Sequence, residues 1–170
     1  QLTKVFDRMT VIENMMFSGS NTKNDSLFRS LMKLSTQKSN ENLIREKAFE
    51  IMKDLNIDHM ADSYARELSG GQKKLLELGR SIINDPKILL LDEPLAGVNP
   101  KLAEEILSII QKLSDQGITI IMVEHNIEAV MKISERVIVL AEGSVIADGN
   151  PEKVRKDPKV IEAYLGSGNE

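Results

Sequence analysis

Two short aliphatic runs on either side of an amphipathic segment constrain the fold of this chain more than any other feature. The runs are KILLLD at residues 87–92 and ITIIMVEH at residues 118–125, and such runs are typical of parallel strands buried on both faces. Between them, Asn99 and Pro100 suit the N-cap and first position of a helix, and Gly117 suits its end. A strand–helix–strand unit almost always forms a right-handed crossover in one parallel sheet. The sequence therefore predicts an α/β fold.

The first half of the chain predicts helices. Thr10 and Glu13 have the spacing of a capping box for a short helix that ends near residue 17, and a loop is expected over residues 18–26. An amphipathic helix is expected around residues 27–32, and the polar stretch 35–42 is expected to separate it from another. The apolar face of that next helix is predicted to contain Ile44, Ala48, Ile51, Met52 and Leu55.

The end of the chain predicts a hairpin followed by two short helices. The hairpin is expected over residues 136–149, with its turn at Glu142 and Gly143. The helices are expected near residues 151–156 and 158–165, and residues 166–170 are expected to be disordered.

Composition excludes several classes of function. The 170 residues suffice for one domain with a core, and a net charge of −4 argues against broad nucleic-acid binding. There is no cysteine, so disulfides and thiolate metal sites are excluded. The aliphatic runs are too short to span a bilayer.

Acidic and imidazole side chains follow the two expected strands. Asp92 and Glu93 end the first run, and Glu124 and His125 end the second. Parallel strands would bring these residues to the carboxyl edge of the sheet, where open α/β folds bind ligands. Pro94 is expected to hold Glu93 in an extended conformation. The pattern favours metal binding and general-base chemistry over a plain strand end.

A pair of glycines opens another expected helix. The sequence LSGGQ at residues 68–72 precedes an amphipathic run that continues to about Ile83. Unpaired N–H groups at a helix start bind anions, and glycine lets a phosphate approach the backbone closely. Ser69, Gly70 and Gly71 are therefore candidates for phosphate binding, although an ordinary turn with a serine cap explains the same residues.

A phosphate loop of the form GxxxxGK[ST] is missing, because the chain contains no Gly-Lys pair. Either the chemistry is not nucleotide hydrolysis, or this loop lies upstream of Gln1. We expect the chain, which lacks an initial methionine, to be a C-terminal fragment.

The motifs LSGGQ (68–72), ILLLDEP (88–94) and VEH (123–125), in this order and spacing, closely resemble an ABC-type ATPase. The resemblance implies a partial cassette of the P-loop NTPase type. Residues 1–80 would form the Q-loop, the helical subdomain and the signature motif. Residues 81–170 would form the C-terminal part of the parallel-sheet core.

The resemblance also implies roles for single residues. Gln1 matches the Q-loop glutamine, which reaches magnesium or water, and Asp92 would hold Mg²⁺ largely through water. Glu93 matches the catalytic glutamate that polarises the attacking water. His125 matches the switch histidine that contacts the γ-phosphate. In this family LSGGQ is the signature motif and ILLLD is the Walker B strand. The residues matched to ATP binding lie in the signature motif and in the loop after the Walker B strand, and they are Leu68, Ser69, Gly70, Gly71, Gln72 and Asn99. Many family members have aspartate where this chain has Asn99, which weakens any role for a negative charge there.

The family's assembly supplies the expected partners. Two ATPase subunits dimerise head to tail, as a homodimer or a heterodimer, so that the signature motif faces the ATP of the partner. The cassette would also dock on transmembrane permease subunits at the cytoplasmic side of the membrane, serve a solute-binding protein indirectly, and bind no nucleic acid. Without its phosphate loop, the chain alone is expected not to hydrolyse ATP.

The subfamily follows from VFDRMTVIENMM, DEPLAGVNP and DPKVIEAYLG, which resemble the ATP-binding subunit of branched-chain amino-acid importers. Importers of urea or short amides and the ATPase of lipopolysaccharide export share such stretches and remain alternatives. A soluble ABC ATPase and a degenerate cassette that lends only its signature motif are further alternatives.

Overall fold

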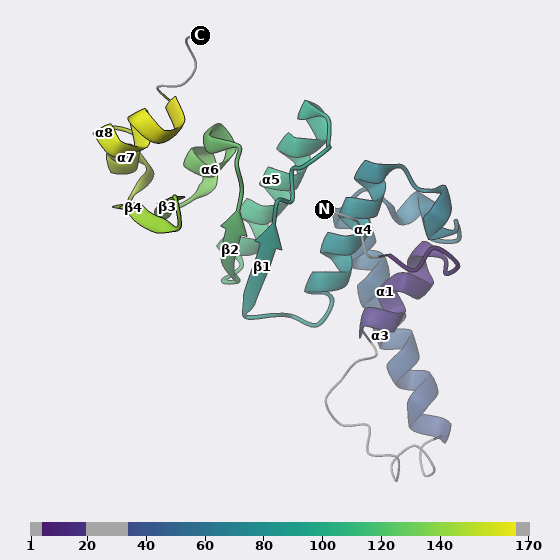
Figure 1. Ribbon diagram of the computed structural model, residues 1–170. Coiled ribbons are helices and arrows are strands. Elements are labelled where there is room, and N and C mark those ends of the chain that lie inside the picture. Colours follow the sequence, from purple (N-terminus) through teal and green to yellow (C-terminus); the bar gives the residue numbers. More distant parts are fainter. Residues whose placement is uncertain (1–4, 20–33, 166–170) are drawn as a thin grey trace. The chain divides into compact units, whose positions relative to one another are not determined.

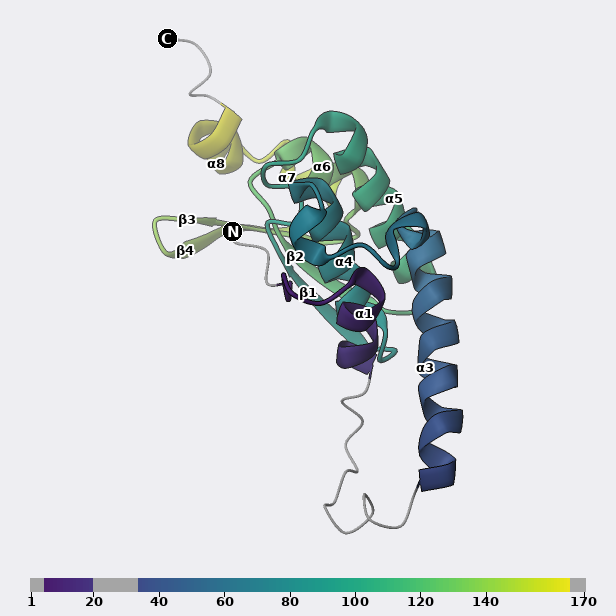
Figure 2. The ribbon, with the colours of Figure 1, turned by 90° about the vertical axis from the view of Figure 1, so that its right-hand side faces the viewer.

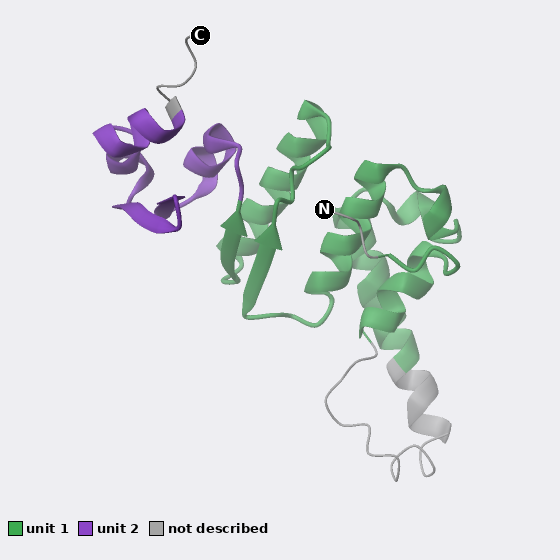
Figure 3. Cartoon of the chain, in the orientation of Figure 1, with its two compact units in different colours: residues 1–123 green, residues 124–170 purple. Residues whose placement is uncertain are grey.

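The computed structural model describes residues 5–19 and 34–165 of the chain. Four sequence predictions lie wholly or mostly outside these residues: the role of Gln1, the loop at 18–26, the helix at 27–32 and the disorder of 166–170. The described residues form two compact units, one within residues 1–123 and the other within residues 124–170 (Figure 3). The expected division into a helical part, residues 1–80, and a sheet part, residues 81–170, remains a prediction.

Three helices are described in the first part of unit 1. They are α1 (Val11–Gly19), α3 (Leu34–Asp54) and α4 (Gly70–Ile82), and each packs against the other two (Figures 1 and 2). Short 3₁₀ turns at Asp58–Met60 and Ala65–Glu67 connect α3 to α4. The predicted capping box of α1 is confirmed, since Thr10 N–H donates to Glu13 at 2.8 Å and Glu13 N–H donates to the Thr10 hydroxyl at 3.3 Å.

The prediction that residues 35–42 separate two helices is wrong, because α3 begins at Leu34. This stretch is polar but contains neither glycine nor proline. Its serine, threonine and asparagine residues each cost only about 0.5 kcal/mol relative to alanine in a helix. A helix that is already nucleated by the buried side chains of Ala48, Met52 and Leu55 extends through such residues at little cost.

A buried asparagine fixes the segment that leads into α1. The side chain of Asn14 is fully buried and accepts a hydrogen bond from Phe6 N–H at 2.9 Å. Its amide group donates to the carbonyl oxygens of Phe6, at 3.1 Å, and Thr10, at 2.9 Å. The amide group also donates to the Met9 carbonyl oxygen at 3.3 Å, so one side chain satisfies four main-chain groups and holds residues 6–10 against the helix.

The strand–helix–strand unit predicted from the sequence is present in unit 1. Strand β1 (Ile88–Asp92) pairs in parallel with β2 (Thr119–Val123), and α5 (Pro100–Asp115) connects them. Figure 1 shows α5 beside the two strands. The buried side chains of α5 are those of Ile106, Leu107, Ile110 and Leu113.

The expectation that both strands are buried on two faces is wrong for the described residues. Leu89 is 5% exposed, whereas Leu90 beside it is 70% exposed. The register pairs Leu90 with Ile121, which is also exposed, so one apolar face of the sheet is uncovered. The physical reason is that α5 covers one face, and no other described element of unit 1 covers the second.

Unit 2 contains the predicted hairpin and short helices. The helix α6 (Ile127–Ile133), which no prediction included, precedes strands β3 (Val137–Ala141) and β4 (Ser144–Gly149). The helices α7 (Pro151–Val154) and α8 (Pro158–Val160) follow, and a π-helical turn covers Ile161–Leu165. A small core is centred on Val137, Val154 and Val160.

Candidate functional site

The acid pair lies at the carboxyl end of the two-stranded sheet. Asp92 is the last residue of β1 and pairs with Val123, the last residue of β2. The N–H of Glu93 donates to the carbonyl oxygen of Val123 at 2.9 Å, so the ladder extends one residue beyond β1. Asp92 is exposed and Glu93 is half-buried. The predicted position of the two carboxylates at this edge is confirmed.

The backbone of Glu93 differs from the expected extended conformation. Its φ is +44°, in the left-handed region that residues other than glycine rarely occupy. The carbonyl oxygen of Glu93 accepts the N–H of Ala96 at 3.1 Å, which closes a tight turn directly after the strand. Pro94 disfavours the right-handed helical conformation at Glu93, but the chain satisfies that restriction by turning left-handed instead of remaining extended. Backbone strain of this kind is common at functional sites.

The start of α4 is fixed by a reciprocal capping box. Gln72 N–H donates to the Ser69 hydroxyl oxygen at 3.3 Å, and Ser69 N–H donates to the Gln72 side-chain oxygen at 2.9 Å. The Ser69 hydroxyl therefore keeps its own proton for a further acceptor. The N–H groups of Gly70 and Gly71 have no hydrogen-bond partner among the described residues. This helix start thus combines the ordinary serine cap with an arrangement suited to an anion.

The two glycines of the signature stretch have different surroundings. A methyl group on Gly70 would meet no atom within 4 Å, so packing inside the chain does not explain this glycine. A methyl group on Gly71 would come within 2.2 Å of the Leu102 side chain. Gly71 therefore allows the starts of α4 and α5 to approach closely, whereas Gly70 leaves the backbone open to an external group.

A lysine that the sequence did not single out connects α4 to the acid pair. The ammonium group of Lys74 donates to the carbonyl oxygens of Glu93, at 3.0 Å, and Pro94, at 3.3 Å. The start of α4 and the turn after β1 are thereby tied together in one unit. No sequence signal identifies this contact, because lysine on a polar helix face normally indicates exposure to solvent.

The side chain of Asn99 caps α5. Its oxygen accepts the N–H of Leu102 at 3.0 Å, as predicted from the Asn-Pro pair. Capping the helix is a sufficient reason for asparagine at this position, with or without a nucleotide. The expected role of Asn99 in ATP binding remains a prediction. Leu68 is buried before the cap, and its N–H donates to the Ala65 carbonyl oxygen at 3.3 Å.

His125 belongs to unit 2. Its side chain is exposed, and its backbone N–H donates to the buried carboxylate of Glu124 at 3.2 Å. The predicted grouping of His125 with Asp92 and Glu93 at one sheet edge remains a prediction.

A magnesium ion with few protein ligands fits the available donors. Within the described residues, no group of three or more histidine, cysteine, aspartate or glutamate side chains is arranged to hold a metal. Magnesium often binds one or two carboxylates and takes its other ligands from water and substrate phosphates. The exposed carboxylate of Asp92 at the end of β1 suits that mode of binding.

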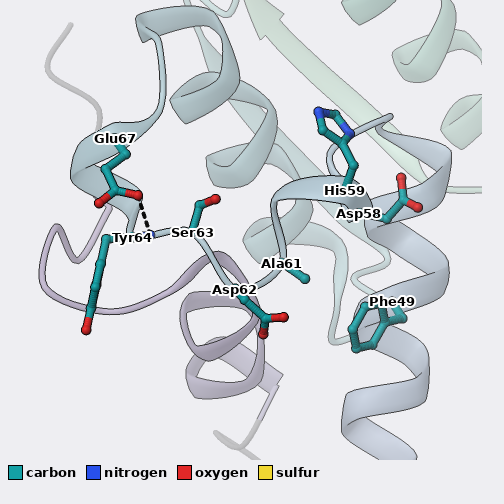
Figure 4. A pocket seen from close by; sticks show the side chains of 8 residues that line it. All are labelled: Phe49, Asp58, His59, Ala61, Asp62, Ser63, Tyr64 and Glu67. Carbon is teal, nitrogen blue, oxygen red and sulfur yellow. Dashed lines mark hydrogen bonds between the residues drawn. The ribbon is translucent and has the colours of Figure 1, made fainter.

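A separate hollow lies among the turns between α3 and α4 (Figure 4). It has a volume of about 520 Å³, and its walls include Phe49, Asp58, Tyr64 and Glu67. His59 also lines it. None of the site residues predicted from the sequence contributes to this hollow.

Comparison with known families decides the assignment of the chain. A family model described as ABC transporter matches residues 1–96, which include LSGGQ and the acid pair. The chain belongs to the ABC transporter family. A second model, described as branched-chain amino acid ATP-binding cassette transporter, matches residues 144–169.

Curated members of the ABC transporter family align with nearly all of the chain. The probable branched-chain amino acid transport ATP-binding protein LivG of Archaeoglobus fulgidus is 40% identical over 98% of this chain and 64% of its own length. The high-affinity branched-chain amino acid transport ATP-binding protein BraF of Pseudomonas aeruginosa is 35% identical over 98% of this chain and 66% of its own length. The lipopolysaccharide export system ATP-binding protein LptB of Haemophilus influenzae is 34% identical over 98% of this chain and 63% of its own length. The chain thus spans about two thirds of these relatives.

Solved ABC cassettes have the same fold. The ADP conformation of MJ1267, an ATP-binding cassette of an ABC transporter, is 38% identical with a TM-score of 0.74, over 95% of this chain and 64% of that one. A nucleotide-free ATP-binding cassette is 36% identical with a TM-score of 0.73, over the same shares of the two chains. The expected fold class, a partial ABC cassette with mixed helices and strands, is confirmed. Among the described helices, none is both long and apolar enough to cross a bilayer.

Proposed function

We propose that these 170 residues are part of the ATP-binding and ATP-hydrolysing subunit of an ABC transporter that drives import of branched-chain amino acids. The observation that carries this proposal is the alignment of 98% of the chain with subunits named for that transport, at 35–40% identity. The C-terminal match to a branched-chain amino acid cassette supports the same solute class. Lipopolysaccharide export is the alternative with a relative of similar identity.

The geometry of unit 1 supports the ATPase part of the proposal. A helix start with open N–H groups at Gly70 and Gly71 suits the phosphate of an ATP held by the partner subunit, and the exposed Asp92 suits the metal ion of the ATP bound at this chain's own sheet edge. Lys74 joins these two features within one unit. Bound Mg²⁺ would neutralise charge on the phosphates and orient them.

The proposed roles follow the matched positions. Asp92 holds the ion largely through water, and Glu93 accepts a proton from the attacking water. Ser69 and the two glycines donate hydrogen bonds to the γ-phosphate of ATP held by the partner subunit. His125 contacts the γ-phosphate, and Gln1 reaches the ion or the water. Leu68, Gln72 and Asn99 support these contacts from the signature stretch and from the start of α5.

The assembly that we propose contains two ATPase subunits and the transmembrane permease. The cassettes dimerise head to tail, as a homodimer or as a heterodimer, and sit on the cytoplasmic face of the membrane. A solute-binding protein delivers the solute to the permease without touching the cassette. The bare face of β1 and β2 supports the idea that further polypeptide completes this cassette in the assembled protein.

Transport measured in membrane vesicles tests this proposal. The full polypeptide that contains these residues would be co-purified with its permease and reconstituted, and uptake of leucine, isoleucine and valine would be measured with the solute-binding protein on one side and ATP on the cassette side. We expect ATP-dependent uptake that Glu93→Gln abolishes while ATP binding persists. Uptake that is unchanged by Glu93→Gln would refute the role of this residue. ATP-dependent transport of lipopolysaccharide or urea, but not of these amino acids, would refute the solute.

The 170 residues alone provide a second test. Because they contain no GxxxxGK[ST] stretch, we expect them to show no ATP turnover. Release of inorganic phosphate by the pure chain above the level of its Glu93→Gln variant would contradict this expectation.

A further inference from the structure

The ammonium group of Lys74 lies against the main chain of the turn that contains Glu93. It donates to the Glu93 carbonyl oxygen at 3.0 Å and to the Pro94 carbonyl oxygen at 3.3 Å. Among the described residues, Lys74 has no carboxylate partner, so these two carbonyl groups account for its placement. A half-buried lysine that holds two carbonyl oxygens stabilises one arrangement of the backbone beneath it.

The neighbouring lysine shows that this contact is not a general property of the helix face. Lys73 points to a different partner and pairs with the carboxylate of Asp7 at 3.2 Å. Both lysines belong to the first turns of α4, yet only Lys74 reaches the turn after β1. The two side chains therefore form a matched pair for experiments.

The turn that Lys74 contacts needs support. The left-handed conformation of Glu93, with φ at +44°, is costly for a residue with a side chain. Three hydrogen bonds hold that conformation: Glu93 N–H to the Val123 carbonyl oxygen, Ala96 N–H to the Glu93 carbonyl oxygen, and the Lys74 ammonium to the same oxygen. Only the last of these comes from outside the two-stranded sheet and the turn that follows β1.

We infer that Lys74 is a positioning residue for Glu93. It ties the main chain at Glu93 to the helix that is capped by Ser69. The inference rests on the proposed ATPase function and adds a residue to it. Since Lys74 fixes the peptide and not the carboxylate itself, its loss leaves nucleotide binding intact but lets the Glu93 side chain leave its working orientation. A general base must lie within hydrogen-bond reach of the proton it removes, so this loss lowers the rate of the chemical step.

The test compares steady-state kinetics of variants of the full polypeptide in its assembled transporter. For Lys74→Met we expect kcat for ATP hydrolysis to fall at least tenfold while KM for ATP changes less than twofold. Lys74→Arg restores hydrogen-bond donors and is expected to recover a large part of kcat. The control Lys73→Met removes the same charge from the same helix and is expected to stay within twofold of the unsubstituted protein. Lys74→Gln replaces Lys74→Met if the latter does not fold.

Each outcome decides the inference. A lowered kcat for Lys74→Met with rescue by arginine supports it. Equal kinetics for Lys74→Met and Lys73→Met overturn it, and so does a change confined to KM, which would indicate a role in nucleotide binding.

An inactive unsubstituted protein would overturn the proposed function but not decide the role of Lys74. Amide hydrogen exchange at Ala96 then decides it, because this N–H bonds to the Glu93 carbonyl oxygen. Exchange at least fivefold faster in Lys74→Met than in Lys73→Met supports the positioning role, and equal exchange overturns it.

Discussion

The side chain of Leu102 occupies the space that a methyl group on Gly71 would need, with Leu102 Cδ2 only 2.2 Å from the position of such a methyl carbon. The same substitution at Gly70 meets no atom within 4 Å. Two adjacent glycines of one motif therefore serve different purposes. Gly71 permits contact between α4 and the Leu102 side chain of α5. Gly70 leaves room for a group that is not part of the described chain.

We expect Gly71→Ala to destabilise the chain by about 1 kcal/mol, because the half-buried Leu102 side chain must rotate away from the new methyl group. Gly70→Ala is expected to stabilise it by about 0.5 kcal/mol, because the site is open and the residue has an ordinary φ. Urea denaturation of both variants measures these differences. The interpretation is wrong if both substitutions shift the midpoint in the same direction. In the assembled transporter, Gly70→Ala is nevertheless expected to lower ATP turnover by crowding the phosphate.

Replacement of Glu93 by glycine separates the strain at this position from its proposed role. Glycine adopts the left-handed conformation without steric cost, so Glu93→Gly is expected to stabilise unit 1 by up to about 1 kcal/mol while it abolishes turnover in the assembled protein. Asp92→Gly is the control, because Asp92 lies within β1 and has no positive φ. Thermal denaturation of both variants measures the effect, and a loss of stability in Glu93→Gly equal to that in Asp92→Gly would show that position 93 is not strained.

Acid is expected to weaken the hairpin of unit 2 through Asp148. Hydrogen bonds from the Arg136 guanidinium, at 2.7 and 2.8 Å, lower the pKa of Asp148. A carboxylate whose pKa is lower in the folded chain contributes stability above its unfolded pKa of about 3.9, and this contribution disappears as pH falls through the folded pKa. Circular dichroism melts between pH 5 and pH 2 should therefore show a smaller loss of Tm in Asp148→Asn than in the unsubstituted chain. A loss of equal size would rule out this pair as a source of acid sensitivity.

The uncovered face of β1 and β2 leads to opposite expectations for neighbouring leucines. Leu90→Thr is expected to change the unfolding free energy of the 170-residue chain by less than about 0.5 kcal/mol and to reduce its self-association, because Leu90 is 70% exposed. Leu89→Thr removes a buried side chain and is expected to cost about 2–4 kcal/mol. Urea denaturation and light scattering measure the two effects. If Leu90→Thr is as costly as Leu89→Thr, the face is covered in solution.

Features with local causes were predictable from the sequence. The capping box of α1, the Asn99–Pro100 start of α5 and the hairpin turn at Glu142 and Gly143 each depend on a few adjacent residues, and the structure confirms all three. The parallel pairing of β1 and β2 followed from the connection between them. The position of Asp92 and Glu93 at one strand end then required no further information.

The features that the sequence did not predict depend on tertiary contacts. The left-handed backbone of Glu93 is held by bonds to Val123, Ala96 and Lys74, and Pro94 indicates only that the right-handed helical conformation is disfavoured there. The contact of Lys74 was equally unpredictable from the sequence, because its partners are main-chain carbonyl groups, which every residue has. The polar start of α3 depends on helix extension from a buried region downstream, which periodicity over a short window does not detect. The short helix α6 is capped by Asn126, whose oxygen accepts Ala129 N–H at 3.1 Å, a local signal that would have located it.

The reciprocal bonds between Ser69 and Gln72 bear on how quickly the second subunit of the proposed dimer would engage this surface. Ordering the backbone of one residue costs roughly 1–2 kcal/mol, and at the first turn of α4 that entropy is lost when the chain folds and not at the moment of encounter. Association through this turn should therefore proceed as a collision of preformed surfaces, with a rate limited by diffusion and mutual orientation.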